Sequence, residues 1–241
     1  MSAILKSPPR SAALPIAGET PALRSITTGA VAYPTRGYNA AVETAARAED
    51  LLKELASYLD EGRLEHSKYA AAAAVELAQR YAPELVESAH LAGLLHDNAK
   101  GLSDEQLIAE AARLDIEVSD VERRVPALLH GKVGAALLHE RFGVDDPEVA
   151  QAVADHVTGR PGMGTLSRIM FVADQMAEDR EFEGVDDLRE MAKKDLEQAL
   201  FMVARFKLRY IIDKEVPIDP STVKLYNELC PGERECSDWK D

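Results

Sequence analysis

The sequence of 241 residues has little of several features that would otherwise define its class. Its two cysteines, Cys230 and Cys236, both lie near the C-terminus and are too few for a disulfide framework or a cysteine zinc site. The longest apolar runs, such as residues 169–173, are far shorter than the roughly 20 residues of a membrane helix, and no signal-peptide pattern opens the chain. Alternating runs of β-branched residues, typical of strands, are also absent. We therefore expect an all-α, soluble, cytoplasmic protein with no membrane partner.

Positive charge is also scarce, because 28 basic residues stand against 42 acidic ones and the net charge is −14. Surfaces that bind nucleic acids need clustered lysine and arginine, so we expect no nucleic-acid partner. The charge is uneven along the chain. Residues 1–48 hold five basic and two acidic side chains, and the remaining residues have a net charge of −17. This difference separates an N-terminal extension from an acidic body.

Composition divides the chain into three parts. Residues 1–42 are rich in Ser, Pro, Ala, Thr and Gly, which predicts a disordered or loosely docked extension. Its arginines and few acids are also typical of a transit peptide, but it lacks a clear amphipathic helix. We expect residues 43–230 to form one domain, for which the length is sufficient, and residues 231–241 to form a C-terminal tail.

The body is predicted to be an irregular helical bundle. Apolar residues recur at a spacing of three to four, as in Leu51, Leu55 and Leu59, among many Ala, Leu, Glu and Arg residues. Ser103 with Gln106 predicts a capping box at one helix start. Besides the helix that begins at 42, we predict helices over residues 64–81, 84–96, 103–113, 131–141, 147–157, 165–177, 185–193, 195–213 and 220–229.

His96 and Asp97 are the first residues that indicate chemistry. They end the apolar run 91–95, so two side chains able to bind metal leave a buried segment side by side. Neighbouring residues of a helix diverge by roughly 100°. His96 and Asp97 can therefore approach one ion from two sides, or Asp97 can bridge two ions.

Asp174 lies on the face of a predicted helix that Met170 and Phe171 direct into the core. A carboxylate is costly to bury there unless it is paired or bound to metal. An ion pair with an arginine such as Arg168 or Arg180 is the alternative explanation, and the sequence does not decide between the two.

Three further histidines, His66, His130 and His156, lie on separate predicted helical segments. Each alone could be a core histidine with its hydrogen bonds satisfied. Taken with the three residues above, however, they make four histidines and two aspartates, a set typical of a binuclear site for Fe, Zn, Ni or Mn. His90 and His139 should point away from these positions, and we expect neither to bind metal.

Phosphate-binding elements lie near the same residues. Lys100 follows His96 by four residues, and the glycine-rich loop 158–164 follows His156 directly. Arg160 in this loop offers two parallel donors for phosphate oxygens, and lysine offers a compact charge. The loop could equally be a simple turn between helices, and its interest comes from its position beside His156.

Taken together, these motifs resemble the HD phosphohydrolase superfamily, and within it the YqeK-type branch. The resemblance covers residues 45–229 and implies an all-α bundle of the HD-domain type. It also implies symmetrical bis(5'-nucleosyl)-tetraphosphatase activity, which cuts diadenosine tetraphosphate into two ADP. The matching stretches are RLEHS (63–67), AGLLHDNAK (92–100), LHGKVGA (129–135), HVTGRPGM (156–163) and PIDPST (217–222), followed by Asn227.

The resemblance also implies the site residues. Two divalent transition-metal ions are expected, most often iron, with Mn, Co, Ni and Zn as alternatives. One ion would be held by His66, His96, Asp97 and Asp174, and the second by His130, His156 and the bridging Asp97. Asp97, Lys100 and Arg160 would be catalytic, and substrate would be bound by Lys100, Thr158, Gly159, Arg160 and Arg180.

One segment departs from the family pattern, which tends to show a Glu-Pro pair before the arginine. Here Ala177, Glu178 and Asp179 precede Arg180, so the shape of this loop and the nucleoside preference are open. Other HD substrates remain as alternatives, namely a deoxynucleotide, an alarmone or a cyclic nucleotide. A di-iron oxygenase and a nucleotide sensor without turnover are further alternatives, and a homodimer is an additional expectation.

Overall fold

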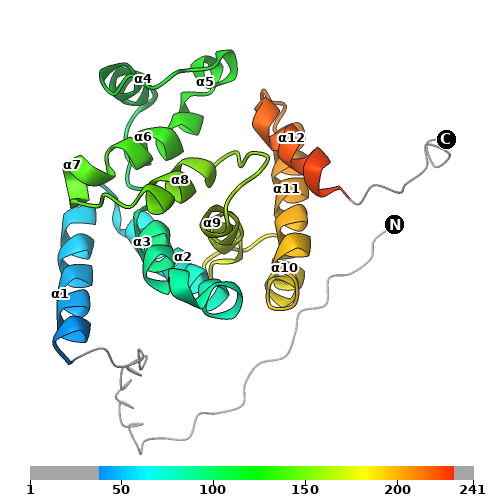
Figure 1. Ribbon diagram of the computed structural model, residues 1–241. Helices are drawn as coiled ribbons and strands as arrows, with labels where there is room; N and C mark the ends of the chain where they lie inside the picture. The colour runs from blue at the N-terminus through cyan, green and yellow to red at the C-terminus, as the bar shows by residue number, and fades with distance from the viewer. Residues whose placement is uncertain (1–37, 231–241) are drawn as a thin grey trace, which may run out of the picture. The chain divides into compact units, whose positions relative to one another are not determined.

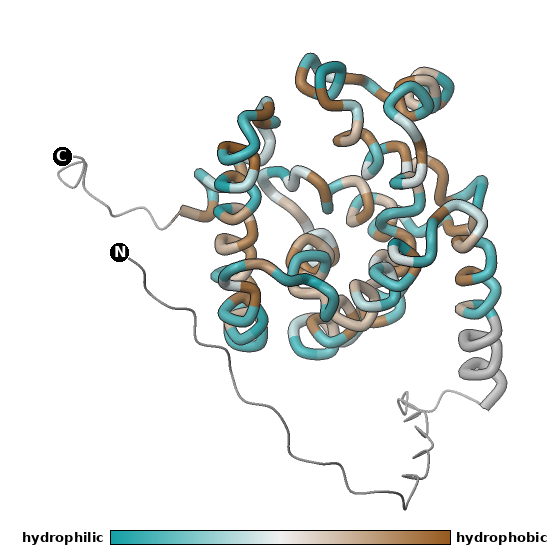
Figure 2. Tube along the Cα trace, turned by 180° about the vertical axis from the view of Figure 1, so that it is seen from behind, coloured by the Kyte–Doolittle hydropathy of each residue, from teal (hydrophilic) through white to brown (hydrophobic). Residues whose placement is uncertain are grey.

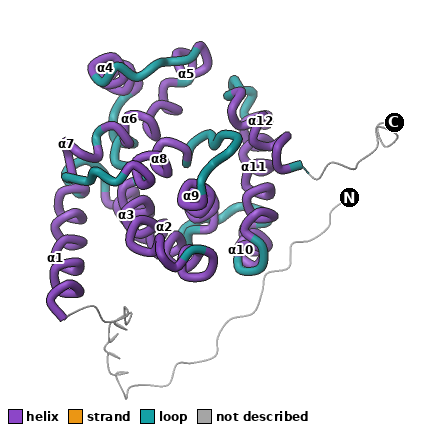
Figure 3. Tube along the Cα trace, viewed as in Figure 1, coloured by secondary structure: helices purple, strands orange, loops and turns teal. Residues whose placement is uncertain are grey.

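The computed structural model describes the backbone of residues 38–230 and the side chains of residues 47–230. This part of the chain consists of helices joined by turns and contains no strand, as Figure 3 shows, so the predicted all-α class is confirmed. The first helix begins at Tyr38, and the domain boundary expected after residue 42 therefore falls within it. The rest of the predicted extension and the tail at 231–241 lie outside the described residues. The elements are α1 (Tyr38–Leu55), α2 (Glu61–Tyr81), η1 (Pro83–Leu85), α3 (Val86–Leu95), α4 (Asp104–Arg113), α5 (Asp120–Arg124), η2 (Pro126–Leu129), α6 (His130–Ala136), α7 (Leu138–Phe142), α8 (Pro147–Asp155), α9 (Thr165–Met176), α10 (Val185–Ala192), α11 (Leu196–Asp213) and α12 (Pro220–Leu229).

The middle of helix α9 is buried on all sides. The consecutive residues 169–173 have no exposed surface, whereas an ordinary amphipathic helix leaves one face to solvent. Helices α2, α3, α8, α10 and α11 pack against it, and Figure 1 shows α9 among them, seen nearly along its axis. Because α9 lies at the centre of the main core, Asp174 on this helix is held inside the protein.

Helices α2 and α3 approach each other closely because small residues line their contact. A Cβ added at Gly93 would lie 2.5 Å from the Cα of Ala71, so only glycine fits at this position. Ala70 and Ala74 on α2 are fully buried in the same core. This close packing brings the segment after α3 near the start of α2, where His66 lies.

A second, smaller core lies under α4, η2 and α6, and it is formed by Ala99, Leu107, Ala111, Leu129, Val133 and Leu137. The helix predicted over 131–141 is divided into α6 and α7 at Leu137. Leu137 packs into this small core, while Leu138 packs into the main core. A single straight helix would direct adjacent residues only about 100° apart, and the turn lets the two leucines reach different cores.

The short elements α5, η1 and η2 were not predicted from the sequence. Helix α5 had a usable signal, because Ser119 and Glu122 form a capping box, with each side chain bonded to the other residue's backbone N–H. In Figure 2, hydrophobic and hydrophilic residues alternate along the described helices, as expected where one side faces a core. Among the described residues, no helix combines the length and apolar character needed to cross a membrane.

Candidate metal centre

Six side chains from five segments converge inside the bundle, and each residue is at most 8% exposed. Three of the histidines occupy equivalent local positions, because each comes immediately after a helix or 3-10 turn. His96 directly follows the last residue of α3, His130 that of η2 and His156 that of α8. His66 instead lies within α2. Asp97 directly follows His96, and Asp174 lies on α9. The structure thus brings together all six residues predicted as ligands: His66, His96, Asp97, His130, His156 and Asp174.

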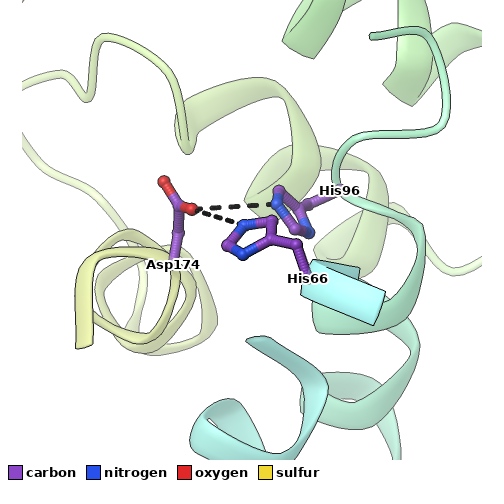
Figure 4. A group of neighbouring side chains, drawn as sticks. All are labelled: His66, His96 and Asp174. Atoms are coloured by element: carbon purple, nitrogen blue, oxygen red, sulfur yellow. Dashed lines mark hydrogen bonds and ion pairs between the residues drawn. The ribbon is translucent and has the colours of Figure 1, made fainter. Parts of the chain in front are cut away.

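One half of this centre lies between α2, the end of α3 and α9. The Nε2 atom of His66 is 3.1 Å from Oδ1 of Asp174, and the Nε2 atom of His96 is 3.8 Å from the same oxygen. Figure 4 shows both imidazoles directed toward the Asp174 carboxylate. These three residues form one of the groups able to surround an ion.

The other half lies around Asp97. Its Oδ1 atom is 3.2 Å from Nε2 of His130 and 3.4 Å from Nε2 of His156, and these two nitrogens are 3.1 Å apart. The second carboxylate oxygen of Asp97, Oδ2, is 3.6 Å from Nε2 of His96. Asp97 therefore faces both halves, one with each oxygen.

The three histidines at helix ends share one tautomer. The Nδ1 of His96 lies 2.7 Å from the carbonyl of Gly93, and the Nδ1 of His156 lies 2.7 Å from that of Val153. His130 makes the same contact with the carbonyl three residues before it. A carbonyl only accepts, so each Nδ1 carries the proton and donates it. Each Nε2 therefore presents a lone pair to the centre of the site.

Several acceptors thus face one another with no proton between them. Nε2 of His96 and Oδ1 of Asp97 are buried and have no hydrogen-bond partner. Leaving such atoms unpaired is costly unless a cation satisfies them. Two metal bonds of about 2.1 Å that meet at about 90° to 110° place the donor atoms about 3.0 to 3.4 Å apart, close to most of the separations described above. The residues therefore fit divalent ions.

The charge states suit the same purpose. Burial alone raises the pKa of Asp97, but the neighbouring His96 and the other facing groups outweigh it and hold this pKa well below its usual range. For Asp174, burial likewise opposes ionisation, while His66 and Arg180 lower the pKa well below its usual range. Both carboxylates are therefore ionised at neutral pH, which is the form that binds metal.

The deeply buried imidazoles are neutral. Burial lowers the pKa of His96, and it lowers the pKa of His156 to about 3 despite the nearby Asp97 carboxylate. For His66, burial also lowers the pKa, but the hydrogen bond and charge of Asp174 outweigh it, so the net shift is upward. His66 is thus the histidine of these three that binds a proton most readily.

The predicted phosphate residues occupy different positions around the centre. Nζ of Lys100 is 3.2 Å from Nε2 of His130 and 3.6 Å from Oδ1 of Asp97, while 41% of its side chain is exposed. Arg180 forms an ion pair with Asp174, so the arginine partner that the sequence suggested for this carboxylate is also present. Arg160 instead donates from Nε to the buried carboxylate of Asp155 at 2.9 Å.

The loop that contains Thr158 and Gly159 is held by the C-terminal helix. The Thr222 hydroxyl of α12 donates to the Thr158 carbonyl at 2.8 Å. Gly159 has a φ of +64°, and a Cβ there would lie 2.5 Å from Leu225 of α12, so this position requires glycine. Further along, the amide of Gly162 donates to the carboxylate of Glu228. Helix α12 therefore holds the loop through packing and hydrogen bonds, and the motif at 217–222 contributes the hydrogen bond of Thr222.

The two histidines expected to lie apart do so. Within the described residues, neither joins a group able to surround an ion. His90 is partly exposed on α3, and His139 is exposed and lies 2.6 Å from Asp145. The position of His139 relative to His130 was predicted from the rotation per residue along one continuous helix. This reasoning does not apply, however, because the turn at Leu137 separates the two residues.

Two residues of the site were not found from the sequence. Lys207 of α11 donates to the carbonyls of His156 and Val157 at 2.8 and 3.0 Å, and its ammonium lies 4.5 Å from the centroid of the Phe171 ring. Burial lowers the pKa of Lys207 to about 8. Asp179 contacts His66. The sequence did not indicate a role for Lys207, because a lysine on a long helix is common and usually lies on the surface.

Known proteins match this chain over most of its domain. The HD domain family matches residues 63–179. The symmetrical bis(5'-nucleosyl)-tetraphosphatase of Bacillus subtilis (strain 168) is 33% identical over 184 residues, covering 76% of this chain and 98% of the relative. The protein of the same name from Halalkalibacterium halodurans is 34% identical over 172 residues, covering 71% of this chain and 91% of the relative.

A solved structure matches as well. It is the crystal structure of a predicted HD superfamily hydrolase involved in NAD metabolism from Clostridium acetobutylicum. The TM-score is 0.73 at 36% sequence identity, over 77% of this chain and 98% of that chain. The helical frame and the buried histidines and aspartates therefore define an HD-domain hydrolase, a class that binds divalent metals. Within this class, the chain belongs to the family of the symmetrical bis(5'-nucleosyl)-tetraphosphatases.

Proposed function

We propose that this chain hydrolyses dinucleoside polyphosphates symmetrically, so that diadenosine tetraphosphate yields two molecules of ADP. The observation that carries the proposal is the position of Asp97, whose two oxygens face His96 on one side and His130 and His156 on the other. The relatives with this activity in their names align over 98% and 91% of their lengths, which supports the same reaction here.

We further propose that the six residues hold two divalent ions. His66, His96 and Asp174 would hold one, His130 and His156 the other, and Asp97 would be shared. Bound ions of this kind polarise phosphate oxygens and lower the pKa of water to near neutrality. We propose iron as the metal. The mixed set of imidazoles and carboxylates suits Fe, and it also suits Mn, Co, Ni or Zn as alternatives.

The cationic side chains would bind the phosphate chain. Lys100 is suited to offset charge that develops on the phosphate, because its ammonium lies beside Asp97 and is partly open to solvent. Arg180 lies at the opposite half of the centre, beside Asp174. Arg160 is held through Nε by Asp155 and through Nη1 by the Pro161 carbonyl, and we assign its Nη2 to substrate. We assign Thr158 and Gly159 to the same contact surface.

We propose that residues 43–230 form the catalytic domain, and that deletion of residues 1–38 preserves turnover. Loss of turnover on this deletion would count against these limits.

The cytoplasm is the proposed location, since nucleotide substrates are found there. A homodimer stays a prediction, which light scattering of the purified protein would test.

Product analysis tests the proposed reaction. With diadenosine tetraphosphate and Fe²⁺, Mn²⁺ or Co²⁺, the full-length protein should release ADP as its sole nucleotide product. AMP together with ATP would instead indicate asymmetric cleavage. An oxygen electrode separates the di-iron oxygenase alternative, because the proposed reaction consumes no oxygen. A panel containing a deoxynucleotide, an alarmone and a cyclic nucleotide tests the other HD substrates.

A further inference from the structure

His66 is held differently from the other three histidines of the centre. His96, His130 and His156 each directly follow a helix or 3-10 turn, and each Nδ1 lies beside the backbone carbonyl three residues earlier. Their Nδ1–H groups use these carbonyls. His66 lies inside α2, where the carbonyl of each residue already accepts from the N–H four residues later. Its Nδ1 therefore needs an acceptor from elsewhere.

Asp179 supplies that acceptor. This residue lies between α9 and α10, and its Oδ2 and Oδ1 atoms are 2.8 and 3.0 Å from Nδ1 of His66. The Asp179 side chain is 33% exposed, whereas that of His66 is 9% exposed. The imidazole is thus anchored from the surface by a charged side chain.

The contacts on both sides of the ring agree on its tautomer. An ionised carboxylate only accepts hydrogen bonds, so Nδ1 of His66 donates to Asp179. On the other side, Nη2 of Arg180 lies 3.2 Å from Nε2 of His66, and a guanidinium only donates. Nε2 therefore carries the lone pair and faces Asp174.

We propose that Asp179 is a positioning residue that fixes the tautomer and orientation of His66 and strengthens its Nε2 as a metal ligand. The ion surrounded by His66, His96 and Asp174 then depends on a side chain in a partly exposed loop, and the ion beside His130 and His156 does not. This inference rests on the proposed two-ion centre. Carboxylates behind metal-bound histidines raise the basicity of the ligand, and their loss typically weakens metal binding about 10- to 100-fold.

The loop itself provides a matched control. Glu178 precedes Asp179, carries the same charge and has an exposed side chain. Neither the hydrogen bonds nor the ion pairs of the described residues include its carboxylate. Asp179→Ala and Glu178→Ala therefore remove the same charge from the same loop, but only the first removes an acceptor from His66. Asp179→Asn keeps an acceptor without the charge, and Asp179→Glu keeps the charge on a longer side chain.

Chelator competition on the full-length, Co²⁺-loaded protein tests this inference. Asp179→Ala should weaken one of the two ions about 10- to 100-fold and leave the other unchanged. Asp179→Asn should show an intermediate loss, Asp179→Glu should restore part of the affinity, and Glu178→Ala should match the wild type. An equal effect on both ions, or an equal effect of Asp179→Ala and Glu178→Ala, would overturn the assignment.

A spectroscopic readout separates positioning from a general structural effect. Co²⁺ shifts the exchangeable ring N–H resonances of its histidine ligands in proton NMR. Asp179→Ala should broaden or abolish the resonance of one histidine, His66, through faster exchange with water, and the other three should remain. If wild-type protein holds two Co²⁺ ions and the spectrum of the variant is unchanged, the role of Asp179 is refuted and the proposed function stands. If the wild type holds none of Co²⁺, Fe²⁺ and Mn²⁺, both fall.

Discussion

The two halves of the metal centre are built from similar residues but are supported by different parts of the chain. Around Asp97, the rings of His130 and His156 are oriented by backbone carbonyls of their own segments. Around Asp174, the ring of His66 is oriented by Asp179, which is 113 residues away in the chain. Local backbone contacts form whenever the helix end forms, whereas the contact to Asp179 depends on the loop after α9. The half around Asp97 should therefore tolerate changes at the surface better.

The largest expected effect follows from removing the residue that both halves share. Asp97→Ala should lose most of both ions, and turnover should fall on the order of a thousandfold or more, because metal ions contribute several kcal/mol to the stabilisation of the transition state. Metal analysis of the purified variant checks this. His90→Ala and His139→Ala are the controls and should keep full metal content. Full metal retention by Asp97→Ala would rule out a shared ligand.

Removing a ligand from one half should separate the two ions. Asp174→Ala takes away the carboxylate that lies 3.1 Å from His66, while the contacts of Asp97 with His130 and His156 remain. We expect this variant to keep about one ion per chain and to lose most of its turnover, since both ions act on the phosphate. Metal stoichiometry measured together with rate tests this. Loss of both ions would erase the distinction between the halves.

The phosphate residues should affect rate without affecting metal. Lys100→Ala should reduce turnover on the order of a hundredfold, the typical effect of losing one donor that stabilises transition-state charge. Arg160→Ala should have a smaller effect, because Arg160 is tied to Asp155 and Lys100 lies closer to Asp97. Both variants should keep the metal content of the wild type. Rates near the wild type for both would remove the phosphate roles and leave the metal site intact.

Acidification should release the two ions in order. A proton competes with a metal ion for the same lone pair of histidine. The pKa of His66 is raised above its ordinary value of 6.5, while that of His156 is lowered to about 3. As the pH falls, His66 is therefore protonated first, and the ion it holds should leave first. Metal retained after dialysis across a pH series measures this, and a single step that releases both ions would contradict it.

The smallest expected effect concerns the loop 158–164 and the helix that holds it. Thr222→Val removes the hydrogen bond to the Thr158 carbonyl at nearly constant volume, which typically costs about 1 kcal/mol. We expect a change of up to about tenfold in KM with little change in metal content, since α12 contacts the loop and not the ligands. Thr222→Ser, which keeps the hydroxyl, should restore KM. An equal loss in both variants would point to packing instead.

Much of this arrangement could be predicted from the sequence, because its determinants are local. The helical spacing of apolar residues predicted every long helix, and the predicted ends at 96 and 157 lie within one or two residues of the observed ends at Leu95 and Asp155. All six candidate ligands lie together, although their role as ligands stays a prediction. The break between α6 and α7 was missed, because it depends on two separate cores that receive Leu137 and Leu138.

Asp179 and Lys207, which support the metal centre, could not be predicted because their contacts join distant segments of the chain. Asp179 and His66 are far apart in the chain, and an aspartate in a loop is the ordinary composition of a surface turn. Lys207 reaches the carbonyls of His156 and Val157 from another helix, which only the packing of α11 reveals. Contacts between distant segments are therefore the part of the site that needed a structure.

Anomalous diffraction from crystals of the full-length protein grown with Mn²⁺ tests directly whether two ions share Asp97. We expect two peaks about 3.5 to 4 Å apart on either side of Asp97, one beside His66, His96 and Asp174 and the other beside His130 and His156. A single peak, or two peaks of which neither lies next to the Asp97 carboxylate, would contradict the shared two-ion centre.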